Sequence, residues 1–162
     1  MLKSVPFEVT LADKQSVILL ESFISEFIKK NQKRIKVKAF FEEQSLEFYA
    51  ALKKEKSGLH RIYFSKAKQK ELGVFMNDYF TLQVFEDTSK YGVEMSEELE
   101  AVLLTDYDAF KIFEDLTPGR KRSIIYAISR YKSSQMRVEK ALILTQNLKK
   151  GIKDPKMWFK PQ

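Results

Sequence analysis

The heptapeptide Leu116-Thr117-Pro118-Gly119-Arg120-Lys121-Arg122 divides an acidic helical region from a basic one. Residues 96–117 contain seven carboxylates and one cation, whereas residues 118–160 contain twelve Lys or Arg and two carboxylates. Thr117 as an N-cap, followed by Pro118 at the first helical position, predicts that a new helix begins at this boundary. Two helical segments of opposite charge are therefore adjacent along the chain.

Helical spacing of apolar residues around this boundary predicts four helices. N-caps are expected at Ser96, Asp106 and Thr117, and the fourth helix is expected to begin near Ser133 or Ser134. Gly151, preceded by two lysines, predicts the end of that helix. We expect these side chains to face the core: Leu99, Val102, Leu103, Tyr107, Phe110, Phe113, Ile124, Ile125, Ile128, Tyr131, Val138, Ala141, Leu142, Thr145 and Leu148.

The first half of the chain is predicted to form strands. Alternating apolar residues or short apolar runs occur at residues 5–11, 16–20, 34–40, 46–52, 58–64 and 79–86. Short helices are expected at residues 21–30 and 66–72, and residues 53–57 form a charged loop. Three cations share one face of the 34–40 strand, a pattern that often protects a sheet edge.

This pattern predicts an α+β fold, with a small β-barrel at residues 1–88 and a compact helical unit of about four helices at residues 89–151. A basic and aromatic tail follows at residues 152–162. A chain of 162 residues can bury roughly two-thirds of its unfolded surface in its core. Metal ions and disulfides are therefore not needed for stability.

Composition restricts the chemistry that the protein can perform. Cysteine is absent, which excludes disulfides, thiolate metal sites and thiol nucleophiles, and is compatible with a cytoplasmic location. No apolar run approaches the roughly 18 residues of a membrane span, and the first residues do not resemble a signal peptide. The one histidine, His60, alternates with apolar residues, so we expect it to lie in or beside the core of the barrel. We expect no catalytic residues, metal or cofactor.

Net charge is +7, because residues 118–162 carry a net charge of +10 and residues 1–117 one of −3. Such asymmetry favours an anionic partner, such as nucleic acid, a lipid surface or an anionic ligand. Alternatively, the basic face simply neutralises the acidic helices beside it.

A family resemblance rests on two blocks. The first runs from Gly58 to Lys66, then through Leu72-Gly73-Val74 and Asn77-Asp78 into residues 79–86. The second runs from Leu99 to Gly151, with these intervening positions: Ala109, Phe110, Phe113, Leu116, Arg120, Lys121, Arg122, Ile128, Lys132 and Arg137. The chain resembles the YdeI/OmpD-associated, or bacteriocin-protection, family with its preceding β-barrel domain of unknown function. The resemblance implies a barrel similar to those of AbrB-type regulators, and it implies no known reaction.

Cations in the first turn of a helix oppose the helix dipole, so their presence at residues 120–122 needs a reason. Glu114 and Asp115 neutralise them in one interpretation, whereas in the other they form an anion site at the helix start. The candidate anion- or nucleic-acid-binding residues are Arg120, Lys121, Arg122, Arg130, Lys132 and Arg137. In the tail, Trp158 and Phe159 either pack against the protein, stack on bases or insert at a membrane interface.

The sequence thus supports a non-enzymatic cytoplasmic binding or stress-associated protein of this family. A nucleic-acid-binding module that uses the basic helices is the alternative. An enzyme acting on a small anionic substrate near Arg120, Arg122 and Arg137 is a third possibility.

Overall fold

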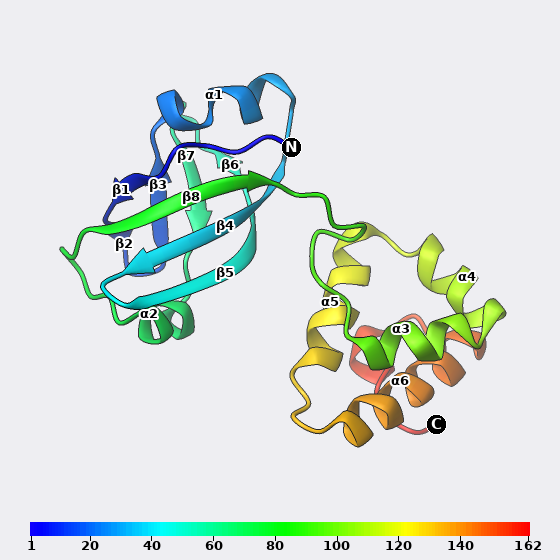
Figure 1. The fold of residues 1–162 in the computed structure, drawn as a ribbon. Helices are drawn as coiled ribbons and strands as arrows, with labels where there is room; N and C mark the ends of the chain where they lie inside the picture. The colour runs from blue at the N-terminus through cyan, green and yellow to red at the C-terminus, as the bar shows by residue number, and fades with distance from the viewer. The chain divides into compact units, whose positions relative to one another are not determined.

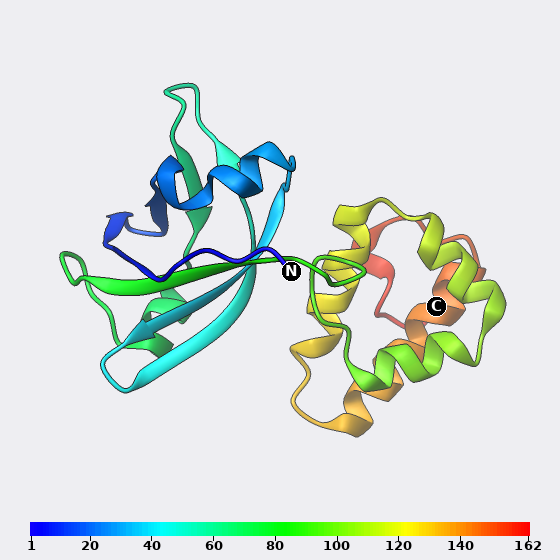
Figure 2. The same cartoon turned by 45° about the horizontal axis from the view of Figure 1, so that its top comes forward.

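The computed structural model describes residues 1–162 and divides into two compact units, Met1–Thr88 and Ser89–Gln162. We call them the sheet unit and the helical unit. Strands are confined to the first and four of the six α-helices to the second (Figure 1 and Figure 2). Each unit has its own cluster of buried apolar side chains. The chain is thus an α+β protein with two separate cores.

The sheet unit contains two four-stranded antiparallel sheets. One has the order β1 (Phe7–Val9), β8 (Phe80–Glu86), β4 (Arg34–Phe41) and β5 (Gln44–Ala51). The other has the order β2 (Leu11–Asp13), β3 (Ser16–Leu19), β7 (His60–Tyr63) and β6 (Lys53–Lys54). Two short helices complete the unit, α1 (Glu21–Lys29) and α2 (Lys66–Leu72).

Aromatic side chains join the two sheets across a common core. The Phe64 ring lies 5.5 Å from that of Phe48 and 5.4 Å from that of Phe80, centroid to centroid. Phe64 directly follows β7, whereas Phe48 and Phe80 belong to the other sheet. The sheets meet through these side chains and no closed ring of strands is found, so the expected barrel is not confirmed.

The first expected strand is divided between the two sheets. β1 pairs with β8, whereas β2 pairs with β3. Phe7, Val9 and Leu11 are nevertheless all buried, so the alternation continues while the pairing partner changes. The periodicity of this segment therefore indicates which side chains are buried, but it does not indicate which strands pair with the segment.

Two further expectations about strands were wrong. Lys53 and Lys54, expected in a loop, form β6 and pair with β7. The edge-protection interpretation fails for β4, because β4 lies between β8 and β5. Its lysines instead contact a carboxylate on β5, with Lys36 Nζ 3.1 Å and Lys38 Nζ 3.2 Å from Glu47 oxygens.

The helical unit contains α3 (Glu97–Leu104), α4 (Tyr107–Asp115), α5 (Pro118–Ser129) and α6 (Ser134–Lys149). All four begin at a side chain that accepts a backbone N–H hydrogen bond, and the caps are Ser96, Asp106, Thr117 and Ser133. Such caps satisfy N–H groups that have no partner within the helix. The four expected helices are therefore confirmed. None of the helices in the structure has the length and apolar character needed to cross a bilayer.

Two side chains expected in the helical core are exposed. Tyr107 is 75% exposed and Leu142 is 50% exposed, whereas Leu144 is fully buried. Tyr107 is the first residue of α4, where the chain has not yet completed a turn over the core. On α6 the buried face is centred on Ala141, Leu144 and Leu148.

Residues 152–162 pack onto the helical unit and include a 3₁₀ turn at Pro155–Met157. Trp158 is 1% exposed, and its indole N–H donates to the Ile152 carbonyl at 2.9 Å. This side chain is therefore a core residue and is not available for stacking on bases.

Candidate ligand-binding site

The loop before α3 places an aromatic side chain against α4. The Tyr91 hydroxyl donates a hydrogen bond to the Glu114 carboxylate, and its ring meets the Phe113 ring edge-on at 5.6 Å. Burial, together with this hydrogen bond, raises the pKa of Tyr91 above its ordinary value. Tyr91 thus stays protonated and acts as a fixed donor to Glu114.

The neighbouring residue, Lys90, extends over two aromatic rings. Its ammonium lies 5.3 Å from the centroid of Tyr91 and 5.6 Å from that of Phe110. It also lies 3.8 Å from a carboxylate oxygen of Glu114. A cation within about 6 Å of a ring centroid is attracted by the ring's negative face. Two rings and a carboxylate therefore hold this ammonium.

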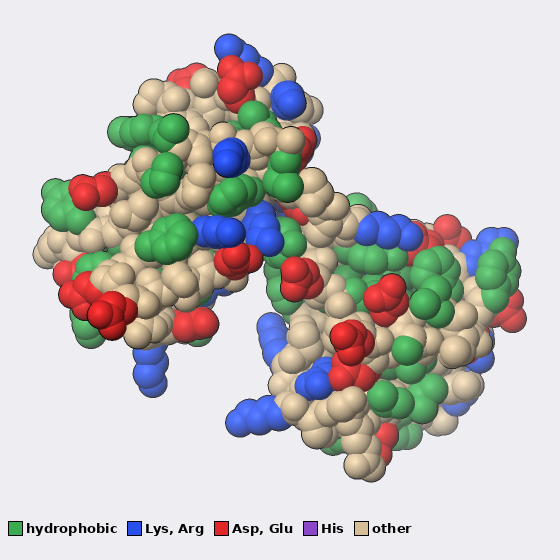
Figure 3. Space-filling model, in the orientation of Figure 1, with side chains coloured by type: hydrophobic (Ala, Val, Ile, Leu, Met, Phe, Trp, Pro, Cys, Tyr) green, Lys and Arg blue, Asp and Glu red, His purple; other side chains and the backbone are tan.

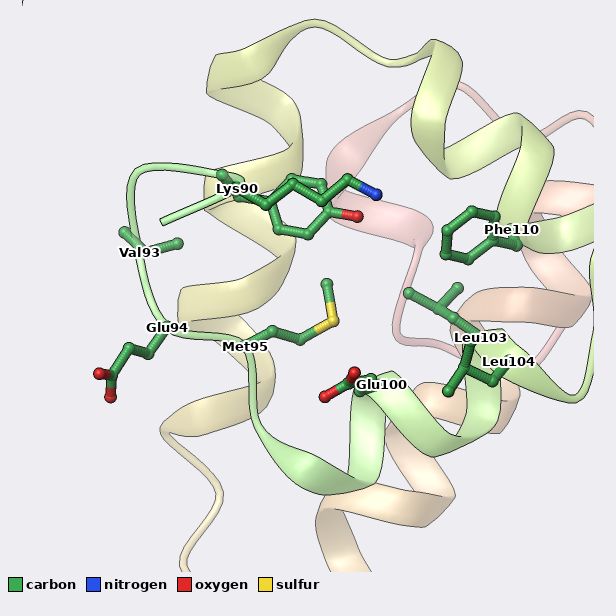
Figure 4. A pocket seen from close by; sticks show the side chains of 9 residues that line it. Lys90, Val93, Glu94, Met95, Glu100, Leu103, Leu104 and Phe110 are labelled. Carbon is green, nitrogen blue, oxygen red and sulfur yellow. The ribbon is translucent and has the colours of Figure 1, made fainter. Parts of the chain in front are cut away.

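Beside these rings the helical unit has a cavity of about 400 Å³. It is lined by Lys90, Tyr91, Val93, Glu94, Met95, Glu100, Leu103, Leu104 and Phe110. Figure 4 shows Lys90 reaching across one side of the cavity toward Phe110, with Met95 and the leucines of α3 on other sides. Its size falls in the usual range for pockets that bind small molecules.

Charge in the cavity is carried by Lys90, Glu94 and Glu100. In Figure 4 the Glu94 carboxylate points away from the other labelled side chains, whereas that of Glu100 lies on the cavity side of α3. Glu100 also contributes to the raised pKa of Tyr91, after burial and Glu114. Figure 3 shows carboxylates and hydrophobic side chains together on the face that carries α3 and α4. The cavity is thus lined mainly by apolar side chains, and the charged groups that face it are Lys90 and Glu100.

The basic residues predicted from the sequence lie mainly outside this cavity. Arg120 is exposed and Arg122 is partly exposed, both in the first turns of α5. Side chains two positions apart point to opposite sides of a helix, so these two guanidinium groups diverge. Lys121, between them, directs its ammonium to 5.8 Å from the Tyr91 ring centroid. Glu114 bonds to Tyr91 and Lys90, so it does not pair with the two arginines.

Arg137 has an internal role. Its guanidinium contacts the Glu98 carboxylate at 2.9 Å and donates to the carbonyls of Tyr131 (2.7 Å) and Lys132 (3.0 Å). It therefore fastens the turn between α5 and α6 to the start of α3. Arg130 and Lys132, on either side of this turn, are exposed.

Two ion pairs join the acidic helices to the basic α6. Besides the pair of Arg137 and Glu98, Lys149 Nζ lies 2.7 Å from the Asp106 carboxylate. The hydrogen bond from Arg137 lowers the pKa of Glu98 to about 2, and that from Lys149 lowers the pKa of Asp106. Part of the charge asymmetry in the sequence is therefore neutralised inside the helical unit.

His60 lies in the sheet unit and is buried, as expected. Its Nδ1 has no hydrogen-bond partner in the structure. The residues of the cavity, by contrast, were missed by sequence reasoning. Lys90 and Tyr91 lie in a loop without periodicity, and their partner Glu114 is more than twenty residues away. The only signal was an aromatic residue next to a lysine, a pair too common to identify a site.

Residues 92–151 match the family described as "Bacteriocin-protection, YdeI or OmpD-Associated". The match lies within the helical unit and does not extend to the sheet unit. The family segment contains α3 to α6 and most of the cavity lining, while Lys90 and Tyr91 directly precede it. The resemblance stated from the sequence is thus confirmed for the helices.

No curated protein matches the chain. A solution structure of PHS018 from Pyrococcus horikoshii aligns over 55% of this chain and 100% of its own, with 15% identity. Its TM-score is 0.39, and a likeness this weak carries no argument about fold or function.

Proposed function

We propose that this protein is a non-enzymatic binding protein of the YdeI/OmpD-associated family, acting in the cytoplasm, and that its helical unit takes up a small ligand. The observation that supports the proposal most is the cavity of about 400 Å³ beside Tyr91 and Phe110. A bacteriocin-protection role rests on the family's description alone. The cytoplasmic location accords with a chain that has no cysteine.

The chemistry of the cavity favours binding over catalysis. Its apolar lining offers contact area, and its few charged groups offer orientation, which is the usual composition of a ligand pocket. The Tyr91 hydroxyl is committed to Glu114, and the sole histidine is buried in the other unit. The sequence of residues 58–86 resembles that of the domain often found ahead of these helices, which supports the same family assignment.

Methionine methyl NMR tests ligand uptake in the full chain. Met95 lines the cavity, whereas Met136, on α6 in the same unit, does not. With ¹³C-methyl methionine, a mixture of cationic, neutral and anionic fragments is expected to shift the Met95 signal and leave that of Met136 unchanged. If no fragment class moves the Met95 signal selectively, the proposed pocket function is wrong.

A second candidate function, binding of an anionic ligand or nucleic acid, is favoured by the exposure of several cations. Arg120, Arg130 and Lys132 are exposed, and Arg122 is partly exposed. Because Arg120 and Arg122 diverge around the helix, an extended polyanion fits them better than a compact anion. Arg137 contributes less than the sequence suggested, because Glu98 and two carbonyls already hold it.

Mobility-shift titrations with single- and double-stranded DNA and RNA test this candidate. Binding through phosphates is expected to weaken steeply with salt, and replacing both Arg120 and Arg122 by Ala would reduce the salt slope by about two. The matched control replaces Lys153 and Lys156 by Ala, which removes the same charge elsewhere. Equal effects of the two double variants would indicate nonspecific attraction to a basic protein and refute a site at the start of α5.

A further inference from the structure

The cavity already holds a cation, and that cation belongs to the protein. The Lys90 ammonium lies within 6 Å of the centroids of Tyr91 and Phe110 and near the Glu114 carboxylate. The side chain is nevertheless 65% exposed, and it belongs to a loop residue outside the helices. It can therefore leave the rings for solvent at small cost.

Withdrawal of Lys90 leaves a space whose walls favour positive charge. The faces of Tyr91 and Phe110 are electron-rich, the Glu114 carboxylate lies 3.8 Å from the Lys90 ammonium, and Glu100 lines the cavity. Lys121, whose ammonium is 5.8 Å from the Tyr91 centroid, is the remaining cation in contact with these groups. A cation at the place that the Lys90 ammonium leaves would therefore meet two ring faces and the Glu114 carboxylate.

We propose that the cavity binds an ammonium ligand with a short apolar chain, and that the ligand's cation replaces that of Lys90 at the rings of Tyr91 and Phe110. The apolar chain packs against Met95, Leu103 and Leu104, which line the rest of the cavity. This inference rests on the proposed pocket function and names its ligand class. Free amines and the lysine side chains of other proteins share this chemistry.

Other ligand classes fit the same walls less well. An anion would face Glu100, Glu114 and the negative faces of two rings, all of which repel it. A neutral apolar molecule would gain the contacts with Met95 and the leucines. It would, however, give the carboxylates of Glu100 and Glu114 no cationic partner. Charge therefore decides the ligand class, and the apolar lining adds affinity.

Lys90 acts as an internal competitor in this arrangement. A ligand binds only to those molecules in which the Lys90 ammonium has left the rings of Tyr91 and Phe110. Its apparent affinity is therefore the intrinsic affinity multiplied by the fraction of such molecules. Replacing Lys90 by Ala removes the competitor, although it also removes one contact to Glu114. The variant is expected to bind ammonium ligands more tightly than the wild type.

The test uses the Met95 methyl signal of the full chain with four matched probes: n-butylammonium, tetramethylammonium, n-butanol and butyrate. The two cations are expected to shift the signal at lower concentration than the alcohol or the acid. A further arm with a short peptide that carries one lysine distinguishes a free amine from a protein side chain as the source. Tighter binding of the peptide than of butylammonium would indicate a protein partner.

Three variants assign the effect to individual groups. Lys90→Ala is expected to tighten butylammonium binding, whereas Phe110→Leu and Glu100→Gln are expected to weaken it. Each change in the dissociation constant should be about 2- to 30-fold, which is the range that cation–π and single charge contacts span. The Met136 signal and the thermal midpoint of each variant report whether the fold is retained. Because Glu100→Gln changes an exposed position, it keeps the test valid if Phe110→Leu unfolds.

The outcomes separate the two proposals. Cation-selective shifts that respond to the variants support both. If butanol or butyrate shifts Met95 more readily than the cations, the pocket binds ligands but the inferred class is wrong. If none of the probes shifts Met95 in the wild type or in Lys90→Ala, both the inference and the pocket function fail.

Discussion

Asn147 on α6 is the residue whose substitution tests the docking of the tail most sharply. Its side-chain nitrogen donates to the carbonyl oxygens of Met157 (3.1 Å), Trp158 (2.9 Å) and Lys160 (2.8 Å), and the residue is 1% exposed. The two N–H bonds of one amide are thus shared among three carbonyls of the tail. Without this amide, the Trp158 carbonyl loses its donor, whereas the carbonyls of Met157 and Lys160 each keep one, from the Lys160 N–H (3.2 Å) and the Gln162 side-chain amide (3.1 Å).

Asn147→Ala is expected to lower the free energy of unfolding by about 1 to 3 kcal/mol, the cost of leaving buried polar groups unpaired. Asn147→Asp places a carboxylate against carbonyl oxygens, and we expect a loss of about 3 to 5 kcal/mol at pH 7. Burial would raise the pKa of the new carboxyl, so the protonated form is favoured in the folded state. The loss relative to wild type should therefore shrink as the pH is lowered.

Urea unfolding followed by the fluorescence of Trp158 measures these effects, because it is the single tryptophan and lies in the tail. Gln146→Glu is the matched control, since it makes the same amide-to-acid change at the exposed neighbouring position. The control should alter stability by less than about 0.5 kcal/mol. If Asn147→Asp behaved like the control, the tail would not be held by this side chain.

Two further predictions concern charge and backbone conformation. Arg137 holds the pKa of Glu98 near 2, below the ordinary glutamate value of 4.5, so this pair stabilises the fold above pH 4.5 and the contribution is lost as pH falls toward 2. Acid unfolding followed by circular dichroism should therefore begin at a higher pH in Arg137→Met than in wild type, and an unchanged midpoint would contradict the pairing. Gly119 and Gly151 both have room for a methyl group, but only Gly151 has a left-handed φ, of 80°. Gly119→Ala should raise the free energy of unfolding by about 0.4 to 1 kcal/mol, and Gly151→Ala should lower it by about 1 to 2 kcal/mol. Equal effects of the two substitutions in urea unfolding would show that the left-handed φ at Gly151 does not affect stability.

Local chemistry made the helix boundaries predictable. Ser65, Ser96 and Thr117 each accept a backbone hydrogen bond from the third residue of the following helix, as their types suggested. Gly73 has φ of 84° at the end of α2, a conformation that costs glycine little. These features depend on a few consecutive residues, so one sequence is enough to find them.

Features that depend on distant partners could not be predicted in the same way. The alternation of Phe7, Val9 and Leu11 indicated burial, but the change of sheet between β1 and β2 depends on β8 and β3. Arg137 was a candidate anion ligand until Glu98, almost forty residues earlier, proved to bind it. The cavity depends on contacts from Lys90 and Tyr91 to α4, which no local pattern encodes.

Intermolecular NOEs from the methyl protons of tetramethylammonium give the most direct test of ligand binding in the helical unit. Recorded on the full chain, they should reach the Met95 methyl and the Phe110 ring, and they should strengthen in Lys90→Ala. NOEs that reach neither residue in the wild type or in that variant would contradict the proposed ammonium site.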